Sequence, residues 1–218
     1  MSFDAIAPHY RWMEPLLAGR KLQSCRIAHL HRLASPQSVL ILGQGPGKFL
    51  APFRQRFPHA RVTCIDSSQR MLGIAQHNVV SGDVPLEKIS FIHANALDYN
   101  YAPASYDLIV THFFLDCFGP EELRHLISQL ASAATPSANW LLSDFSIPQS
   151  GFPRLRALAI HRLMYAFFRV TANLSARSLN PPEEFLRSHA FNLQHRSCTN
   201  LGLLHSDLWS RRVDGPLS

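Results

Sequence analysis

The feature that most constrains the fold is the alternation of short apolar runs with amphipathic segments between residues 38 and 145. Runs rich in apolar and β-branched residues predict buried strands at 38–43, 61–66, 89–95, 139–145 and the start of 106–118. Apolar residues at helical spacing predict helices at 47–57, 67–80 and 121–134. Strands that alternate with helices build a parallel sheet covered on both faces. The sequence therefore predicts an α/β fold.

The flanking segments complete one domain. Residues 3–33 and 152–170 have the apolar spacing of helices and carry basic residues between the apolar ones. Residues 191–198 and 203–210 are predicted as two late strands that form an antiparallel pair at the edge of the sheet. A chain of 218 residues has the usual size of a single domain.

Composition and cysteine usage favour a cytoplasmic protein. Hydrophobic residues make up 46% and charged residues 17%, and no apolar stretch reaches the roughly 18 residues that span a bilayer. The N-terminus lacks the uninterrupted apolar core of a secretory signal. The four cysteines form no CxxC pair, which predicts reduced thiols and no metal site. A net charge of +6 suits nucleic acid or an anionic membrane surface, but many basic enzymes bind neither.

A glycine-rich turn follows the first predicted strand. Gly43, Gly45 and Gly47 let the backbone pass close to a ligand at the carboxyl edge of the sheet, or serve only a tight turn. Asp66 ends the second strand about 20 residues later, where an acid holds ribose hydroxyls. Nicotinamide cofactors and S-adenosylmethionine both carry that ribose. The GxGxG spacing, with Lys48 in place of a last glycine, departs from the GxGxxG of dinucleotide binders.

Four motifs resemble those of a known family. LGQGPG, CIDSSQRML, IHANALDY and YDLIVTHFFLDCF, in this order, resemble the cofactor motifs of class I S-adenosylmethionine-dependent methyltransferases. The resemblance covers roughly residues 38–145, and FDAIAPHYRWME is similar to the opening of the ubiquinone/menaquinone-biosynthesis group. It implies a Rossmann-like three-layer sandwich with seven strands in the order 3-2-1-4-5-7-6 and strand 7 antiparallel. It also implies S-adenosyl-L-methionine as cofactor and S-adenosyl-L-homocysteine as product.

The resemblance assigns cofactor contacts to positions of this chain. The glycine loop passes the methionine and ribose portion, the acid after the second strand holds the ribose, and the residues after the second and third strands flank the adenine. The fourth strand ends beside the reacting methyl group, and an N-terminal aromatic closes over the cofactor. These cofactor-binding positions are Tyr10, Gly43, Gln44, Gly45, Gly47, Asp66, Ser67, Met71, Asn95, Ala96 and Thr111.

Two positions depart from the family pattern. Ile41 stands where members usually carry an acid two residues before the first glycine, and Asn95 replaces the acid that reads adenine. An amide oxygen still accepts a hydrogen bond from an adenine amino group. His112 and Asp116 are the candidate catalytic residues, since a base is needed when the acceptor must lose a proton. His112 also suits a strand cap, and Asp116 a surface acid.

The resemblance implies a division of the chain: an N-terminal helical cap (1–35), a cofactor-binding core (36–146), a helical substrate lid (147–185) and C-terminal strands (186–218). Aromatic residues after the fourth strand and in the lid favour a small aromatic, quinone-like or lipid-like acceptor. The lid helix is basic and amphipathic, so peripheral membrane contact is an alternative to a solvated face.

Other functions were weighed against methyl transfer to a small molecule. A nucleic-acid methyltransferase is disfavoured, because THFF stands where base-amino methyltransferases carry Asn/Asp-Pro-Pro-aromatic, and the arginines are dispersed. A catalytically silent binding protein on the same fold is a further alternative. A nicotinamide oxidoreductase lacks both the last glycine and a Tyr-xxx-Lys pair. The sequence leaves the oligomeric state open.

Overall fold

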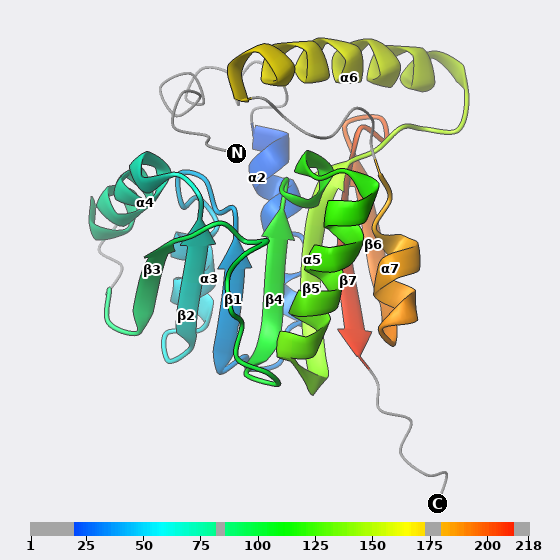
Figure 1. The fold of residues 1–218 in the computed structure, drawn as a ribbon. Helices are drawn as coiled ribbons and strands as arrows, with labels where there is room; N and C mark the ends of the chain where they lie inside the picture. Colours follow the sequence, from blue (N-terminus) through cyan, green and yellow to red (C-terminus); the bar gives the residue numbers. More distant parts are fainter. Residues whose placement is uncertain (1–19, 82–85, 173–179, 212–218) are drawn as a thin grey trace, which may run out of the picture.

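The protein is built around one seven-stranded sheet, seen in a computed structural model that describes residues 20–81, 86–172 and 180–211 (Figure 1). The strand order is β3-β2-β1-β4-β5-β7-β6, as the sequence predicts. Strands β1 to β5 are parallel, and β7 is antiparallel to both of its neighbours. The strands are β1 (Ser38–Leu42), β2 (Arg61–Asp66), β3 (Ile89–His93), β4 (Tyr106–His112), β5 (Ala134–Phe145), β6 (Phe191–Thr199) and β7 (Leu204–Arg211).

Helices cover both faces of the sheet, which gives the predicted three layers. The elements are α2 (Arg20–Ile27), η1 (Leu30–Arg32), α3 (Leu50–Arg56), α4 (Gln69–Ser81), η2 (Leu115–Cys117), α5 (Pro120–Ala133), α6 (Gly151–Ala172) and α7 (Glu183–Ser188). Buried residues of η1, α3 and α4 pack on one face, and those of α5 and α7 pack on the other. Helix α6 crosses the end of the sheet to which the parallel strands point (Figure 1). Within the described residues, no helix is both long and apolar enough to span a bilayer.

Three elements differ from the sequence prediction. Within the described residues, the helix predicted over 3–33 is α2, which ends at Ile27, followed by a turn and the short 3₁₀ helix η1. Strand β5 begins at Ala134 rather than Asn139, because Ala134 pairs with Tyr106 and a register shift follows before the pairing resumes at Leu108. Helix α7 was not predicted; it has six residues, of which only Leu186 is buried, so it is too short to show a helical period.

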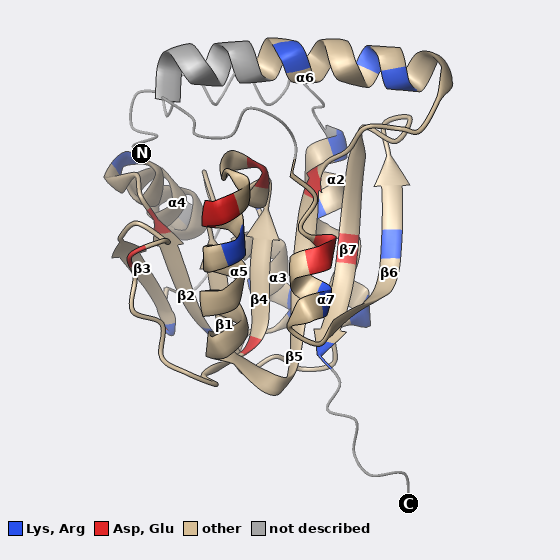
Figure 2. Ribbon diagram, turned by 45° about the vertical axis from the view of Figure 1, so that its right-hand side comes forward, with Lys and Arg blue, Asp and Glu red and all other residues tan. Residues whose placement is uncertain are grey.

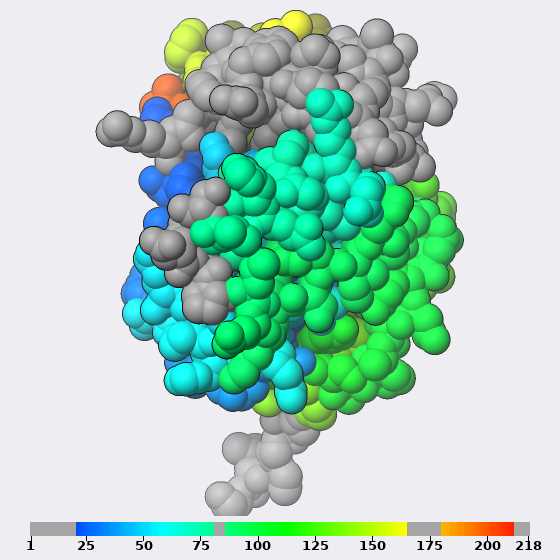
Figure 3. All heavy atoms as spheres, turned by 90° about the vertical axis from the view of Figure 1, so that its left-hand side faces the viewer, coloured from blue at the N-terminus to red at the C-terminus, as the bar shows by residue number. Residues whose placement is uncertain are grey.

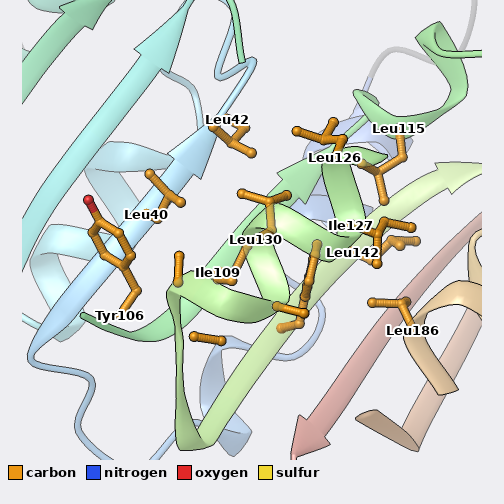
Figure 4. Close-up of a cluster of buried hydrophobic side chains, with 14 of the residues drawn as sticks. Leu40, Leu42, Tyr106, Ile109, Leu115, Leu126, Ile127, Leu130, Leu142 and Leu186 are labelled. Atoms are coloured by element: carbon orange, nitrogen blue, oxygen red, sulfur yellow. The ribbon is translucent and has the colours of Figure 1, made fainter. Parts of the chain in front are cut away.

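Helix α5 anchors the core between the sheet and the solvent. At its N-terminus the Glu122 side chain folds back, and its Oε2 accepts the N–H of Gly119 at 3.1 Å. Its buried side chains pack against β1, β4 and β5 (Figure 4) and are Leu123, Leu126, Ile127, Leu130, Ala131 and Ala133. Burying a leucine contributes about 1.5–3 kcal/mol, so this layer holds the carboxyl ends of the three strands in fixed register.

A hollow of about 450 Å³ lies at the amino ends of the strands. It is lined by Ser38, Arg61, Val62, Thr63, Lys88, Ser90, Ser105 and Tyr106. The described chain between β3 and β4 contains no helix. Figure 3 shows the side of the molecule on which β3 and α4 lie. Ligands of open α/β sheets bind at the carboxyl ends, and this hollow lies at the opposite end from the glycine loop.

Candidate active site

The glycine loop joins β1 to α3 at the carboxyl edge of the sheet. Gly43, Gly45 and Gly47 have φ angles of +59°, +55° and +77°, which are costly for other residues. The loop is held by the Gly43 N–H, which donates to Ile65 O at 3.0 Å. A Cβ on Gly47 would lie 3.2 Å from Ala75, so this glycine also lets α4 pack closely. The loop therefore turns sharply, as a ligand-cradling loop must.

Two side chains beside the loop have buried polar atoms without partners among the described residues. They are Gln44, with both amide atoms, and His112, with both ring nitrogens. Residue Leu42 of β1 pairs with Thr111 of β4, so Gln44 and His112 follow neighbouring strands at the same edge. Buried polar groups are almost always hydrogen-bonded. Their orphaned atoms indicate a polar ligand at this edge.

Asp66 ends β2 and is 8% exposed. Its Oδ1 accepts the N–H of Ser68 at 2.9 Å, which fixes the carboxylate at the start of α4. Ser67 is partly exposed, and the N–H of the buried Met71 donates to Ser68 Oγ at 3.1 Å. The predicted ribose anchor and its two predicted neighbours thus share one tight turn next to the glycine loop.

Asn95 and Ala96 lie in the turn after β3. The Asn95 amide donates to Asp98 Oδ2 at 2.6 Å and accepts the N–H of Leu97 at 3.2 Å. Ala96 is buried, and its carbonyl accepts the Tyr101 hydroxyl at 2.8 Å. Both ends of the Asn95 amide are therefore already engaged within the turn. Asp98 was not foreseen as the partner that orients Asn95, and a local Asn-x-x-Asp pattern was the available signal.

Thr111 is fully buried between β4 and β5, where its Oγ1 accepts the Trp140 indole N–H at 2.8 Å. Its side chain serves the core, so any ligand contact by this residue falls to its backbone. Tyr10, the remaining predicted cofactor residue, lies outside the described residues.

His112 faces the opposite side of the sheet from Thr111, since side chains alternate along a strand. Its ring lies edge-on to Phe49, with centroids 4.9 Å apart. Burial, together with the charge of Arg26 and the neighbouring His29, lowers the pKa of His112 to about 3. His112 is therefore neutral at physiological pH and a poor proton acceptor.

A strained residue follows His112. Phe113 has a φ of +55°, which is rare for a bulky side chain. Its N–H donates to Ser143 O at 2.7 Å, and its ring contacts Phe145 and the Arg26 guanidinium at 5.4 and 5.2 Å. These contacts hold the turn that brings Phe114 onto the glycine loop.

Phe114 covers the first glycine. An added Cβ on Gly43 would lie 2.2 Å from Phe114 Cδ2, so the ring rests directly on this glycine. The same ring packs edge-on against Phe118, with centroids 5.1 Å apart. Phe114, an aromatic residue that follows β4, therefore lies against the glycine loop at the carboxyl edge of the sheet.

Asp116 forms a carboxyl pair with Asp144, which the sequence interpretation missed. Burial raises the pKa of Asp116 to about 6, and hydrogen bonds from Cys117 and Asp144 oppose the shift. Burial and the charge of Asp116 raise the pKa of Asp144 well above its usual range. Two carboxyls in a hydrogen bond share one proton. The signal for Asp144 was its place at the end of the fifth predicted strand.

The carboxyl pair lies within electrostatic reach of Asp66. Burial and the charges of Asp116 and Asp144 raise the pKa of the Cys117 thiol, and Asp66 adds to the same shift. Asp116 thus follows β4 at the carboxyl edge of the sheet, the edge at which Asp66 ends β2. His112 lies at the same edge, where its ring packs against Phe49.

Glu183, His205 and Asp207 form a separate group of metal-ligand type, with ligand atoms within 4.8 Å of one another. Arg196 donates to Asp207 at 2.6 and 2.7 Å and to Glu183 at 2.9 Å. The guanidinium therefore occupies the place and supplies the charge that a cation would. The group is an ion-pair network that ties β6 to β7 and α7.

Comparisons with known proteins find a methyltransferase domain over part of the chain and a solved structure of the same fold. Residues 39–137 match the family described as Methyltransferase domain. The chain is 29% identical over 114 residues to the demethylmenaquinone methyltransferase of Thermotoga maritima, a match that covers 51% of this chain and 46% of that protein. It is 35% identical over 82 residues to the release factor glutamine methyltransferase of Chlorobaculum tepidum, covering 36% and 28%. The matches span less than half the length of either relative.

A solved structure shares the whole fold. A chain of the complex between the Haloferax volcanii Trm112 methyltransferase activator and a methyltransferase superposes with a TM-score of 0.73 at 13% identity, over 97% of this chain and 98% of that one. The strand order, the glycine loop and the position of Asp66 all agree with the methyltransferase domain that the family comparison matches. Residues 39–137 are thus similar to a methyltransferase domain, and the fold of the chain is that of the solved methyltransferase chain.

Proposed function

We propose that the protein transfers a methyl group from S-adenosylmethionine to a small planar or apolar acceptor. The observation that carries this proposal is the carboxyl edge of β1, β2 and β4, where the glycine loop, buried Asp66 and the orphaned polar atoms of Gln44 and His112 meet. These groups fit a ligand that has a ribose and a charged amino-acid tail. The bound cofactor supplies an electrophilic methyl group, so the protein's task is alignment and exclusion of water.

Each residue has a distinct part in this proposal. The loop amides and the Gln44 side chain bind the amino-acid portion, and Asp66 accepts hydrogen bonds from the ribose hydroxyls. Ser67 and Met71 flank the adenine, and the backbone at Asn95 and Ala96 borders it. Neutral His112 donates or accepts a hydrogen bond and holds the ligand in place.

Asp116 is the proposed proton acceptor when the acceptor group carries a proton. A pKa of about 6 leaves its carboxylate mostly ionised at neutral pH and still basic enough to take a proton. Asp144, whose pKa is raised further, keeps the shared proton and orients the Asp116 carboxylate. This assignment replaces His112 as the base, because a pKa of about 3 makes the His112 ring too weak a base.

The acceptor class is supported by the rings near the site. Phe114 rests on the glycine loop and packs against Phe118, and Phe113 beside it contacts the buried Phe145. The name of the Thermotoga maritima relative is consistent with a quinone-type acceptor, whereas the Chlorobaculum tepidum relative is named for a glutamine in a protein. We favour the small acceptor because the Phe114 ring rests on the glycine loop.

The roles of 1–35 as a cap and 147–185 as a lid are also proposed. Leu22 and Cys25 of α2 share a buried cluster with Ala157 and Met164 of α6, which supports a joint cover over the site. The structure does not describe the side chains of three aromatic residues of the lid, which are Tyr165, Phe167 and Phe168.

Binding of S-adenosylhomocysteine by calorimetric titration tests the cofactor assignment. We expect one-to-one binding, no binding of NADH, and a loss of about 1.5–3 kcal/mol in Asp66→Ala, because charge-assisted hydrogen bonds are removed. Glu121→Ala, which removes an exposed acid on α5, is the matched control and should bind normally. Equal affinity of the Asp66 and Glu121 variants would overturn the ribose assignment.

Methyl transfer itself is tested with radiolabelled S-adenosylmethionine and three acceptor types: a hydroquinone, a catechol and a glutamine-containing peptide. We expect transfer to the aromatic acceptors. Transfer to the peptide alone would replace the small-molecule proposal with a protein acceptor.

A further inference from the structure

Helix α6 turns an apolar ridge away from the body of the protein. Phe152, Leu155 and Leu163 are 71%, 68% and 71% exposed. The positions i, i+3 and i+11 fall on one side of a helix, and the ridge runs about 16 Å along it. The opposite side is buried through Ala157, His161 and Met164. The ridge is therefore outside the core packing that holds α6 in place.

The ridge is flanked by cations. Arg162 is exposed along one side of it, the partly buried Arg156 lies along the other, and Arg154 is exposed near the start of the helix, about 100° around it from Leu155. Helix α6 contains no acidic residue, and the acidic residues marked in Figure 2 lie below it. An apolar strip bordered by arginines matches a helix that lies in the interface of an anionic bilayer, with its side chains inserted and its guanidinium groups on lipid phosphates.

One more exposed apolar residue, Leu201, lies in the β6–β7 turn, which contacts α6. Leu201 is 62% exposed, and Asn200 and Leu201 have φ angles of +55° and +58°. Glycine or asparagine fits such positions without strain, whereas leucine does not. An exposed leucine held in a costly conformation has no role in the core, which favours a role in contact with a partner.

The turn and the helix are fastened together. Arg156 donates to Asn200 Oδ1 at 3.2 Å and to Asn200 O at 3.4 Å, and Lys21 Nζ donates to Asn200 Oδ1 at 3.3 Å. A Cβ on Gly202 would lie 3.1 Å from Pro148, just before α6. Leu201 and the ridge therefore move as one surface.

We propose that the α6 ridge, with Leu201 and the flanking arginines, docks the protein on an anionic membrane surface. The parallel strands point toward α6 (Figure 1), so docking places the carboxyl edge of the sheet under the lipid headgroups. The net charge of +6 adds long-range attraction to anionic lipid. Docking does not depend on the proposed methyl transfer, and vesicle binding is measured separately from S-adenosylhomocysteine binding.

Co-sedimentation of the full chain with vesicles tests the proposal. We expect binding to phosphatidylglycerol/phosphatidylcholine vesicles, little binding to phosphatidylcholine alone, and release as ionic strength rises. Leu155→Ser/Leu163→Ser should weaken binding at least about tenfold, since two exposed leucines lose their insertion into lipid. Arg154→Gln/Arg162→Gln should weaken it by about the same factor through lost phosphate contacts.

Matched controls remove the same residue types elsewhere. Val80→Ser/Leu86→Ser removes exposed apolar side chains on α4 and before β3, and Arg61→Gln removes an exposed cation on β2. Both should bind vesicles like the wild type, and all variants should keep S-adenosylhomocysteine affinity if they fold. Equal binding of wild type to neutral and anionic vesicles would overturn the proposal. A wild-type dimer that Leu155→Ser/Leu163→Ser converts to monomer, without vesicle binding, would assign the ridge to a second copy of the chain.

Discussion

Single carboxyl groups decide whether the site can accept a proton. Asp116 is partly buried beside a second acid, Asp144, and desolvation raises its pKa to about 6. A carboxylate whose pKa lies this close to neutral pH is basic enough to act as a general base. An exposed aspartate lacks it, because its pKa of about 3.9 leaves it too weakly basic at neutral pH.

We predict that kcat/KM, measured with whichever acceptor the screen identifies, rises with pH through about 6. The ionised form of Asp116 is the active one, so activity is lost as pH falls through its pKa. Asp116→Asn should remove this limb and lower kcat by about 10²–10⁴-fold. A pH profile unchanged by Asp116→Asn would show that the acceptor needs no base or that the base lies elsewhere.

Asp144→Asn gives the complementary test. The amide donates a hydrogen bond to the Asp116 carboxylate and removes a competing acid, so the acidic limb should move to lower pH. A purely structural Asp144 would lower activity without moving the limb.

The elements of the fold were predictable because their signals are local. The apolar runs of β1 to β5, the helical spacing of α4, α5 and α6 and the late pair β6–β7 are all visible in the sequence, and the structure confirms them. The family resemblance supplied the strand order. Local spacing did not reveal α7, whose six residues contain too little period, or the early start of β5.

The site was predictable in its backbone and less so in its side chains. Glycines and the acid after β2 follow from what a ligand-cradling loop requires. The pairing of Asp116 with Asp144 joins residues 28 positions apart, and the resting of Phe114 on Gly43 joins residues 71 positions apart. No local pattern encodes such contacts, since they arise from β4 lying between β1 and β5 in the sheet.

The loop and helix α4 offer a matched pair of glycines. Gly43→Ala should destabilise the protein and abolish tight S-adenosylhomocysteine binding, because its φ is +59° and the new Cβ meets Phe114 at 2.2 Å. Gly73→Ala should stabilise it by about 0.5–1 kcal/mol, because nothing lies within 4 Å and alanine favours helix. Urea unfolding and calorimetry measure both.

Phe114→Ala separates the two causes at Gly43. Combined with Gly43→Ala it removes the clash but keeps the unfavourable φ, so the double variant should regain part of the lost stability. A Gly43→Ala variant as stable as Gly73→Ala would contradict the close contact between the loop and Phe114.

At the scale of the whole molecule, buried ionisable groups set the pH dependence of stability. Burial lowers the pKa values of His29, His112, His161 and His205, and that of His112 falls to about 3. The unfolded chain then binds protons that the folded chain refuses, so stability falls as pH drops from about 6.5 toward 3. The raised pKa values of Asp116 and Asp144 act in the opposite sense, adding stability as pH falls below about 6.

The contribution of His112 to the pH dependence of stability can be measured by comparing the wild type and a variant. For each protein, the change in folding free energy between two pH values is determined. Lowering the pH from about 7 to about 5 protonates an unfolded histidine of pKa about 6.5 and leaves buried His112 neutral, which costs about 2 kcal/mol of folding free energy. His112→Gln should therefore reduce the pH-induced loss by about that amount, whatever its effect on stability at neutral pH. His125→Gln, on the exposed side of α5, should leave the loss unchanged.

Urea unfolding of the wild type and both variants at the two pH values gives the comparison. An equal loss in the wild type and His112→Gln would mean that His112 takes up a proton in the folded state. Its ring would then be open to water and to charged partners, and the basis for excluding it as the base would disappear. A loss reduced only in His112→Gln ties the neutral ring to the buried edge of the sheet, where Gln44 also has unpaired atoms.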